Sequence, residues 1–289
     1  MASATDLPLP DLDALRHGER VAAAVRRAIA DADGWIPFER YMDVALYAPG
    51  LGYYAAGATK LGAGGDFTTA PEMTPLFGGA LAVQVEAILA ATERRELVEL
   101  GGGSGRLALD LLQGLAARGA LPSRYRIVEV SPQLKARQQQ LLAGPAAALR
   151  VPLDWPPTLP ATVDGAIVAN EVLDAIPVHV VARRDGRYFE CGVAEDERTG
   201  ALAWADRPAP AWLAERATAR FPATGDYRSE INAAAEGLVE ELGRLQAQRR
   251  RARQRVGRDQ RAGVVLDAVD AVGVGRQGPH PRLALQRDG

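Results

Sequence analysis

The sequence predicts an α/β fold built on an open, mostly parallel sheet. An apolar strand near 96–101 runs directly into a glycine-dense turn and then a helix near 106–118. Two further strands follow at the spacing of strand–helix–strand units, one ending at Glu129 and the other at Asn170-Glu171. This alternation is typical of a parallel sheet that binds a ligand at the carboxyl edge of its strands.

The segment before the first strand is expected to be helical and rich in aromatic residues. The predicted elements are a helix over Leu12–Asp33, a helix over 37–47, a turn at Pro49–Gly52, an irregular glycine-rich stretch through Pro71 and a helix over Pro75–Thr92. Pro75 suits an early helical position. We expect residues 1–80 to form an N-terminal helical segment and a cap, with glycines at 62–65 that allow the cap to move.

The middle of the chain, residues 81–243, is expected to hold the core of the fold. Besides the elements above, we predict helices near 132–143, 172–176, 210–220 and 229–245, and strands near 125–130, 149–153 and 164–170. The pair Val178–Arg184 and Arg187–Ala194, joined at Asp185-Gly186, has the sequence of an antiparallel hairpin. A Pro/Ala/Trp-rich connection separates this hairpin from the last two helices.

The tail, residues 244–289, differs from the rest of the chain. It is rich in arginine and has no aromatic residue, isoleucine or lysine. Three explanations are open: an arginine-rich interaction arm, a poorly ordered end, or a shifted reading frame. Gly263–Ala271 could supply one more strand, but we expect the tail to be atypical and poorly ordered.

Composition excludes several classes of function. The chain has 289 residues, is 47% hydrophobic and has a formal net charge of −2, which argues against a general affinity for nucleic acid. No apolar run approaches the roughly 20 residues of a membrane span. Cys191 is the only cysteine, and the three histidines lack metal-ligand spacing, so we expect neither a disulfide nor a metal. Acidic N-terminal residues favour a cytoplasmic protein over an exported one.

The glycine turn indicates which cofactor is bound. The dinucleotide pattern G-x-G-x-x-G, started at Gly101, places the large Arg106 at its third glycine. The pattern E-x-G-x-G-x-G fits instead, with Glu99, Gly101, Gly103 and Gly105, and it is the usual first motif of S-adenosylmethionine (SAM) methyltransferases. Such glycines let the backbone, with Ser104 among them, pass close to a ligand whose carboxylate faces the helix amino end.

Three further residues are candidates for holding this cofactor. Glu129, at the end of the second strand, can accept hydrogen bonds from both ribose hydroxyls, although a solvated acid at a strand end is the alternative. Ser131 follows it directly. Trp155 comes just beyond the third strand, where adenine usually lies, and is otherwise a structural tryptophan.

Several blocks together resemble one family. They are YMDVALYAPGLGYY (Tyr41–Tyr54), GDFTTAPEMTPLFGGAL (Gly65–Leu81), VELGGGSGRLALDLL, YRIVEVSPQLKARQ and NEVLDAIPV. Over roughly residues 15–240 the chain resembles the MidA-type SAM-dependent methyltransferases, which include a mitochondrial arginine methyltransferase of complex I assembly. The resemblance implies a class I methyltransferase core, SAM as the cofactor and methyl transfer to a protein, with an arginine of a complex I subunit as the mitochondrial acceptor. Family members continue into an IDYG-like turn that this tail lacks, so the last strands of the sheet are expected to be missing.

Candidate catalytic residues are carboxylates and one amide. A guanidinium needs a carboxylate that holds it bidentately and accepts its proton. Glu171 ranks first because it ends the fourth strand, and Asn170 beside it could orient a bound group. Asp174, Glu72 and Asp66 complete the set; the last two depend mainly on the family block, and all three could instead be turn or helix caps.

Three functions follow in order of preference. The first is a SAM-dependent methyltransferase acting on a protein. The second is a methyltransferase-like assembly factor that binds SAM and a protein partner without catalysis. The third, a nicotinamide-dependent dehydrogenase, is disfavoured by Arg106 in the third-glycine slot and by the NEVLD block. The oligomeric state and the identity of the methyl acceptor stay open.

Overall fold

The computed structural model describes residues 10–56, 69–255 and 264–267. These residues form two compact units. The parallel-sheet unit takes 53–56, 69–175, 235–255 and 264–267, and the hairpin unit takes 10–52 and 176–234. Each unit has its own sheet and its own hydrophobic core, and each is described separately below.

The parallel-sheet unit has five strands, all parallel. They are β2 (Glu96–Leu100), β3 (Arg124–Val128), β4 (Leu153–Asp154), β5 (Gly165–Asn170) and β10 (Val264–Asp267). Their order across the sheet is β10-β5-β2-β3-β4. The chain leaves β2 towards β3 and β4, and then returns to the other side of β2 for β5 and β10. The order therefore reverses between β2 and β5, which is where open α/β sheets bind ligands.

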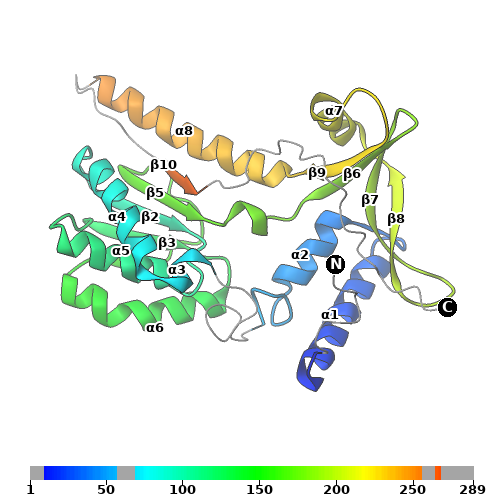
Figure 1. The fold of residues 1–289 in the computed structure, drawn as a ribbon, viewed down its shortest axis with the longest axis horizontal. Coiled ribbons are helices and arrows are strands. Elements are labelled where there is room, and N and C mark those ends of the chain that lie inside the picture. The colour runs from blue at the N-terminus through cyan, green and yellow to red at the C-terminus, as the bar shows by residue number, and fades with distance from the viewer. Residues whose placement is uncertain (1–9, 57–68, 256–263, 268–289) are drawn as a thin grey trace. The chain divides into compact units, whose positions relative to one another are not determined.

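Helices cover both faces of this sheet (Figure 1). The helices α4 (Pro75–Ala90), α5 (Arg106–Ala117) and α6 (Pro132–Leu149) pack on one face, and the short α3 (Ala70–Met73) precedes α4. On the other face, Leu242 and Leu245 of α8 (Ala233–Arg255) pack against Val98 and Ile167. The predicted α/β fold with an open parallel sheet is confirmed. Within Gly263–Ala271, which could supply one more strand although the last strands were expected to be missing, β10 is present and pairs with β5.

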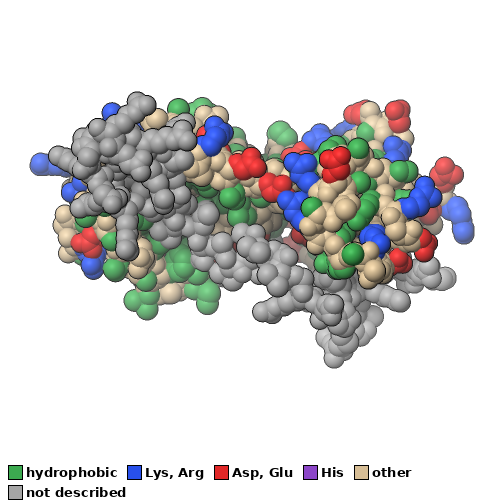
Figure 2. Space-filling view, turned by 90° about the horizontal axis from the view of Figure 1, so that it is seen from above, with side chains coloured by type: hydrophobic (Ala, Val, Ile, Leu, Met, Phe, Trp, Pro, Cys, Tyr) green, Lys and Arg blue, Asp and Glu red, His purple; other side chains and the backbone are tan. Residues whose placement is uncertain are grey.

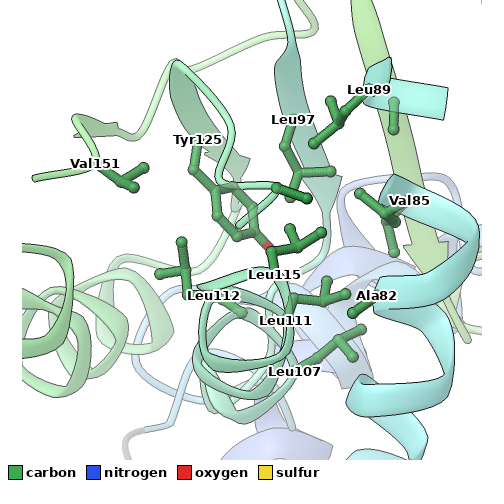
Figure 3. Close-up of a cluster of buried hydrophobic side chains, with 14 of the residues drawn as sticks. Ala82, Val85, Leu89, Leu97, Leu107, Leu111, Leu112, Leu115, Tyr125 and Val151 are labelled. Atoms are coloured by element: carbon green, nitrogen blue, oxygen red, sulfur yellow. The ribbon is translucent and has the colours of Figure 1, made fainter. Parts of the chain in front are cut away.

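The core under α4 and α5 explains why β2 lies at the centre. All five residues of β2 are buried, as expected for a parallel strand covered on both faces. Leu97 lies among Leu111, Leu115 and Tyr125 in the cluster drawn in Figure 3. Burying a leucine side chain contributes about 2 kcal/mol, so this cluster fixes the strand whose carboxyl end carries the glycine turn.

The hairpin unit is built on an antiparallel sheet. Its elements are α1 (Leu12–Ala30), β1 (Ile36–Pro37), α2 (Phe38–Tyr47), β6 (His179–Arg184), β7 (Arg187–Glu195), β8 (Leu202–Pro208), α7 (Ala211–Arg220) and β9 (Tyr227–Ile231). The predicted hairpin is confirmed, and Asp185 and Gly186 at its turn have φ of 49° and 75°. Positive φ at both positions is the geometry that makes Asp-Gly a strong hairpin signal.

Several expectations about elements were wrong in detail. The strands β8 and β9 stand where a connection and the start of a helix were expected, and α8 begins at Ala233 rather than at 229. Helix α6 continues through Pro145 to Leu149, which leaves only Leu153–Asp154 for the third strand. By packing, the hairpin joins the N-terminal helices rather than the parallel sheet. The functional division into 1–80, 81–243 and 244–289 stays a prediction.

The described surface is mixed in charge. On the face shown in Figure 2, acidic and basic side chains lie interspersed on both units. Within residues 10–56, 69–255 and 264–267, no helix is both long enough and apolar enough to cross a membrane.

Candidate functional site

The glycine turn joins the end of β2 to the start of α5. Gly101, Gly103 and Gly105 have φ of 63°, 53° and 87°, and Gly105 is the N-cap of α5. Residues with a Cβ pay about 1–2 kcal/mol in this left-handed region, so the sequence spacing of these three glycines matches three backbone positions that require glycine. The turn is tied to β3 by the Gly101 amide, which donates to the Val128 carbonyl at 2.9 Å.

Gly102 is a fourth required glycine, and the sequence pattern did not single it out. A Cβ at this position would lie 2.7 Å from Ile127 Cγ2 and 3.0 Å from Gln138 Nε2. The backbone at 102 therefore presses directly on β3 and α6. No spacing rule within the motif could have identified it, because the constraint comes from neighbouring elements.

Glu129 follows β3 and is held at both carboxylate oxygens. Oε1 accepts from the Ser131 amide and Oε2 accepts from Gln138 Nε2, each at 2.9 Å. Burial is the main cause that raises the pKa of Glu129, and hydrogen bonds from Ser131, Gln138 and Gly103 counteract it. These contacts, together with one from the Val130 amide, fix the orientation of the carboxylate.

Gln138 links Glu129 to the turn and to Trp155, and sequence reasoning missed it. Its side chain is completely buried in α6. Nε2 also donates to the Gly103 carbonyl at 2.9 Å, and Oε1 accepts from Trp155 Nε1 at 2.8 Å. The sequence reads Gln138-Gln139-Gln140, and only the helical phase, which buries the first, could have distinguished it from the other two.

Glu99 lies beneath the turn rather than on an open surface. Its side chain is buried, and Oε2 accepts from the Tyr125 hydroxyl at 2.7 Å. The pKa of Glu99 is raised to about 7: burial is the largest cause, the Tyr125 hydrogen bond opposes it, and the charge of Glu129 adds to it. The nearness of Glu129 and Glu99 means that a cation bound at this edge of the sheet would stabilise both carboxylates.

Two serines tie other segments to the strand ends. The Ser104 hydroxyl, within the glycine turn, donates to Glu72 Oε1 of α3. The Ser131 hydroxyl caps α6 and donates to the Tyr54 carbonyl at 2.7 Å. The structure therefore brings Glu72 and Tyr54, both N-terminal to the sheet, against the ends of β2 and β3.

The residues after β5 form the other side of this edge. Asn170 Oδ1 is buried, and within the described part of the chain it has no hydrogen-bond partner. Glu171 has a φ of 51°, rare for a residue with a side chain, and strain of this kind clusters at functional sites. Burial raises the pKa of Asp174.

Tyr54 is another residue that the sequence did not assign to the site. Burial is the largest cause that raises its pKa, followed by the charge of Asp174 and the nearby Tyr53 and Glu171. The Tyr54 hydroxyl therefore lies within electrostatic reach of both acidic candidates. The rings of Tyr53 and Tyr54 pack edge to face, with their centroids 5.2 Å apart.

The candidate Asp66 and the possibility of a metal site are considered last. Asp66 lies outside the described residues. Among the residues that the structure describes, no group of three or more His, Cys, Asp and Glu side chains is arranged to hold a metal ion. Cys191 is buried in the hairpin unit, where burial raises its pKa to about 12.

Comparison with known proteins decides the family. Residues 80–266 match a family model of S-adenosyl-L-methionine-dependent methyltransferases. The chain belongs to this methyltransferase family. The predicted resemblance is thereby confirmed, and the dehydrogenase alternative is not supported.

Two relatives describe the extent of the match. The mitochondrial protein arginine methyltransferase NDUFAF7 of Danio rerio is 33% identical over 196 residues, which are 59% of this chain and 46% of the relative. A crystal structure from Burkholderia thailandensis bound to S-adenosyl-homocysteine is 45% identical, with a TM-score of 0.75 over 82% of this chain and 62% of that one. The chain thus spans about half the length of the curated relative and under two thirds of the solved one.

In this methyltransferase, nearly all of the candidate site residues lie at one edge of the parallel sheet. The turn, Glu129 and Trp155 are connected through Gln138, and Ser131 connects this group to Tyr54, Asp174 and Glu171. All of these residues belong to the parallel-sheet unit.

Proposed function

We propose that the chain binds SAM at the carboxyl edge of β2 and β3 and transfers its methyl group to a protein. One observation carries this proposal: a bare turn of four glycines lies beside a carboxylate, Glu129, that is oriented through both of its oxygens. A Cβ at Gly102 would collide with Ile127, so the absence of a side chain there lets the turn pack against β3 and α6. These residues fit SAM better than a dinucleotide, whose pattern fails at Arg106.

The candidate cofactor residues would act on different parts of SAM. The amino end of α5, with the turn 101–105, would hold the carboxylate of SAM. Glu129 would accept from the ribose hydroxyls. Ser131 and Trp155 would lie on the adenine side, and Glu99 would act through its charge from beneath the turn. The S-adenosyl-homocysteine bound to the Burkholderia structure supports SAM as the cofactor.

The residues at the end of β5 and after it would bind the methyl acceptor and remove its proton. SAM, when bound, supplies a methyl group already activated by its positively charged sulfur. An acceptor nitrogen then forms an N–CH₃ bond as the S–CH₃ bond breaks, and the nitrogen loses one proton. Glu171 would hold the acceptor guanidinium and Asp174 would take that proton, because burial raises the pKa of Asp174 and makes it a better base. Asn170 would orient the acceptor.

Arginine is the acceptor that the relatives favour. Several are named protein arginine methyltransferases, including those of Danio rerio and Homo sapiens. Carboxylates suit a guanidinium because they hold it bidentately. Glu72 would position the turn through Ser104, and Asp66 stays a candidate from the family block. The finer proposals are a respiratory complex I subunit as substrate and a cytoplasmic location; both depend on the sequence argument.

Labelling with tritiated-methyl SAM tests the activity. The chain, as it stands, is incubated with SAM and a cell lysate, and the labelled proteins are separated and hydrolysed to amino acids. We expect label in a protein band, as methylarginine, and none with Glu129→Ala, which removes the ribose acceptor. Label in another amino acid would overturn the arginine assignment. SAM binding measured by calorimetry without any label would favour the non-catalytic assembly factor instead.

A further inference from the structure

The buried amide of Gln138 makes three hydrogen bonds to three different parts of the candidate site. Nε2 donates to Glu129 Oε2 and to the Gly103 carbonyl, both at 2.9 Å. Oε1 accepts from Trp155 Nε1 at 2.8 Å. These partners belong to the end of β3, to the glycine turn and to the segment after β4, so a single side chain bonds to all three.

This combination of partners requires a carboxamide. Two of the partners are acceptors and one is a donor, so the side chain must donate twice and accept once. Among uncharged side chains of this length only glutamine does so. Methionine has the same length but cannot donate, and glutamate would place a second carboxylate against Glu129. The surroundings are also tight, because a Cβ at Gly105 would lie 3.3 Å from Gln138 Cα.

Helix α6 fixes Trp155 at a second point. Lys135 Nζ, one turn before Gln138, donates to the Trp155 carbonyl at 3.3 Å. The indole and the backbone of Trp155 are thus both bonded to α6. The same face of α6 therefore sets the position of the tryptophan and of the carboxylate that the proposed ligand would meet.

We propose that Gln138 is a positioning residue of the cofactor site, which sets ribose selectivity by holding Glu129, the Gly103 carbonyl and Trp155 in one arrangement. The inference rests on the proposed binding of SAM, because Gln138 itself is buried and acts through its partners. Without the amide, Glu129 loses the bond from Gln138 at Oε2 and keeps those from the backbone amides of Ser131, Gly103 and Val130. Its carboxylate is then less firmly oriented, so it presents its two acceptors less well to a diol.

The test compares two ligands on four proteins. S-adenosyl-homocysteine and its 2′,3′-dideoxyribose analogue are titrated by calorimetry into the wild type and into Gln138→Met, Trp155→Phe and Gln139→Met. Gln139 is the neighbouring, exposed residue of the same helix and serves as the matched control. The melting temperature without ligand is measured in parallel, because a purely structural role would lower stability and weaken both ligands equally.

We expect the wild type and Gln139→Met to prefer the natural ligand by at least about tenfold, as sites built to hydrogen-bond a hydroxyl do. In Gln138→Met the preference should fall to about twofold or less, because the diol acceptor is no longer oriented. Trp155→Phe removes the indole donor to Gln138 and leaves both bonds from Gln138 Nε2 in place, so it should reduce the ribose preference by a smaller factor. The smaller ring should weaken both ligands alike, because the indole is not assigned to the ribose.

Each result decides between the two proposals. A full preference in Gln138→Met, with or without weaker binding overall, overturns the inference and leaves SAM binding intact. If Gln138→Met does not fold, an unchanged preference in Trp155→Phe overturns it. Failure of the wild type to bind S-adenosyl-homocysteine overturns the proposed function and this inference with it.

Discussion

The Tyr125 hydroxyl donates a 2.7 Å hydrogen bond to Glu99 Oε2, and both side chains are buried beneath the glycine turn. This pair places an ionisable carboxyl at the centre of the parallel sheet, one strand away from Glu129. Burial raises the pKa of Glu99 to about 7 from a usual value of 4.5. A buried acid of this kind makes folding depend on pH in a range where most carboxyls no longer titrate.

Replacing Glu99 with glutamine should remove that dependence. Between pH 4.5 and about 7 the folded protein keeps a proton on Glu99 that the unfolded chain has released. Stability from this group is therefore complete below 4.5 and is lost as the pH rises through 7, by up to about 3 kcal/mol. In urea unfolding at several pH values, the free energy of unfolding of Glu99→Gln should rise relative to that of the wild type from pH 5 to 8.

A second variant checks the cause of this pH dependence. The Tyr125 hydrogen bond lowers the pKa of Glu99, so Tyr125→Phe should move the loss of stability to higher pH. If the free energy of unfolding changed with pH in the same way in the wild type and in Glu99→Gln, Glu99 would not be the group that causes the pH dependence.

Gly102→Ala should damage both the fold and ligand binding. Its Cβ would lie 2.7 Å from Ile127 Cγ2, so the turn or β3 must move. Overpacking of this kind costs about 1–3 kcal/mol, and the displaced turn should weaken the binding of S-adenosyl-homocysteine. Urea unfolding measures the first effect and calorimetric titration the second.

Gly144→Ala is the matched control for Gly102→Ala. Gly144 lies within α6, and a Cβ there meets no atom within 4 Å. Alanine is favoured over glycine inside helices by about 0.5–1 kcal/mol, so this variant should be more stable than the wild type and bind ligand unchanged. A stability loss as large in Gly144→Ala as in Gly102→Ala would contradict the role assigned to the turn.

The sequence predicted the elements that carry a local signal. The turn glycines, the hairpin at Asp185-Gly186 and the helices α4 and α5 each have a turn, a cap or a periodic apolar pattern of their own. Strand β9 was missed although Tyr227, Ser229 and Ile231 alternate with exposed Arg228 and Glu230. That pattern covers only five residues, and the strong helical signal from Ala233 onward extended the expected helix over it.

The rest of the site depends on contacts between distant parts of the chain. Gln138 and Glu129 are on neighbouring elements, but nothing in Gln138-Gln139-Gln140 shows which amide faces inward. Helix α6 passes Pro145 because Leu142 and Ala146 are buried on one face, and such packing outweighs the hydrogen bond that proline removes. Sequence reasoning therefore finds turns and strand ends, whereas burial decides which neutral side chains hold them.

Glu171→Gly should separate the strain at the end of β5 from its function. Glu171 has a φ of 51°, and a glycine relieves a cost of about 1 kcal/mol. We expect higher stability in urea but loss of methyl transfer, because the carboxylate proposed to hold the acceptor is gone. Glu171→Gln keeps the strain, so it should lose activity without the gain in stability.

A control in the hairpin unit has the same backbone geometry without the proposed chemistry. Asp185 has a φ of 49° at the exposed hairpin turn, so Asp185→Gly should also stabilise the protein but leave methyl transfer unchanged. If Glu171→Gly retained full activity, the role given to Glu171 would be wrong whatever its stability.

Ser131→Ala should release the segment around Tyr54 as well as weaken α6. The hydroxyl accepts from the Leu134 amide as the N-cap of α6, and it donates to the Tyr54 carbonyl at 2.7 Å. Loss of an N-cap costs about 1 kcal/mol, and loss of the second bond frees residues 53–56. Thr74→Ala removes only a cap, that of α4, and is the control. Hydrogen exchange should accelerate over 53–56 in Ser131→Ala and not in Thr74→Ala; equal protection in both would mean that Ser131 does not hold Tyr54 at the edge of the sheet.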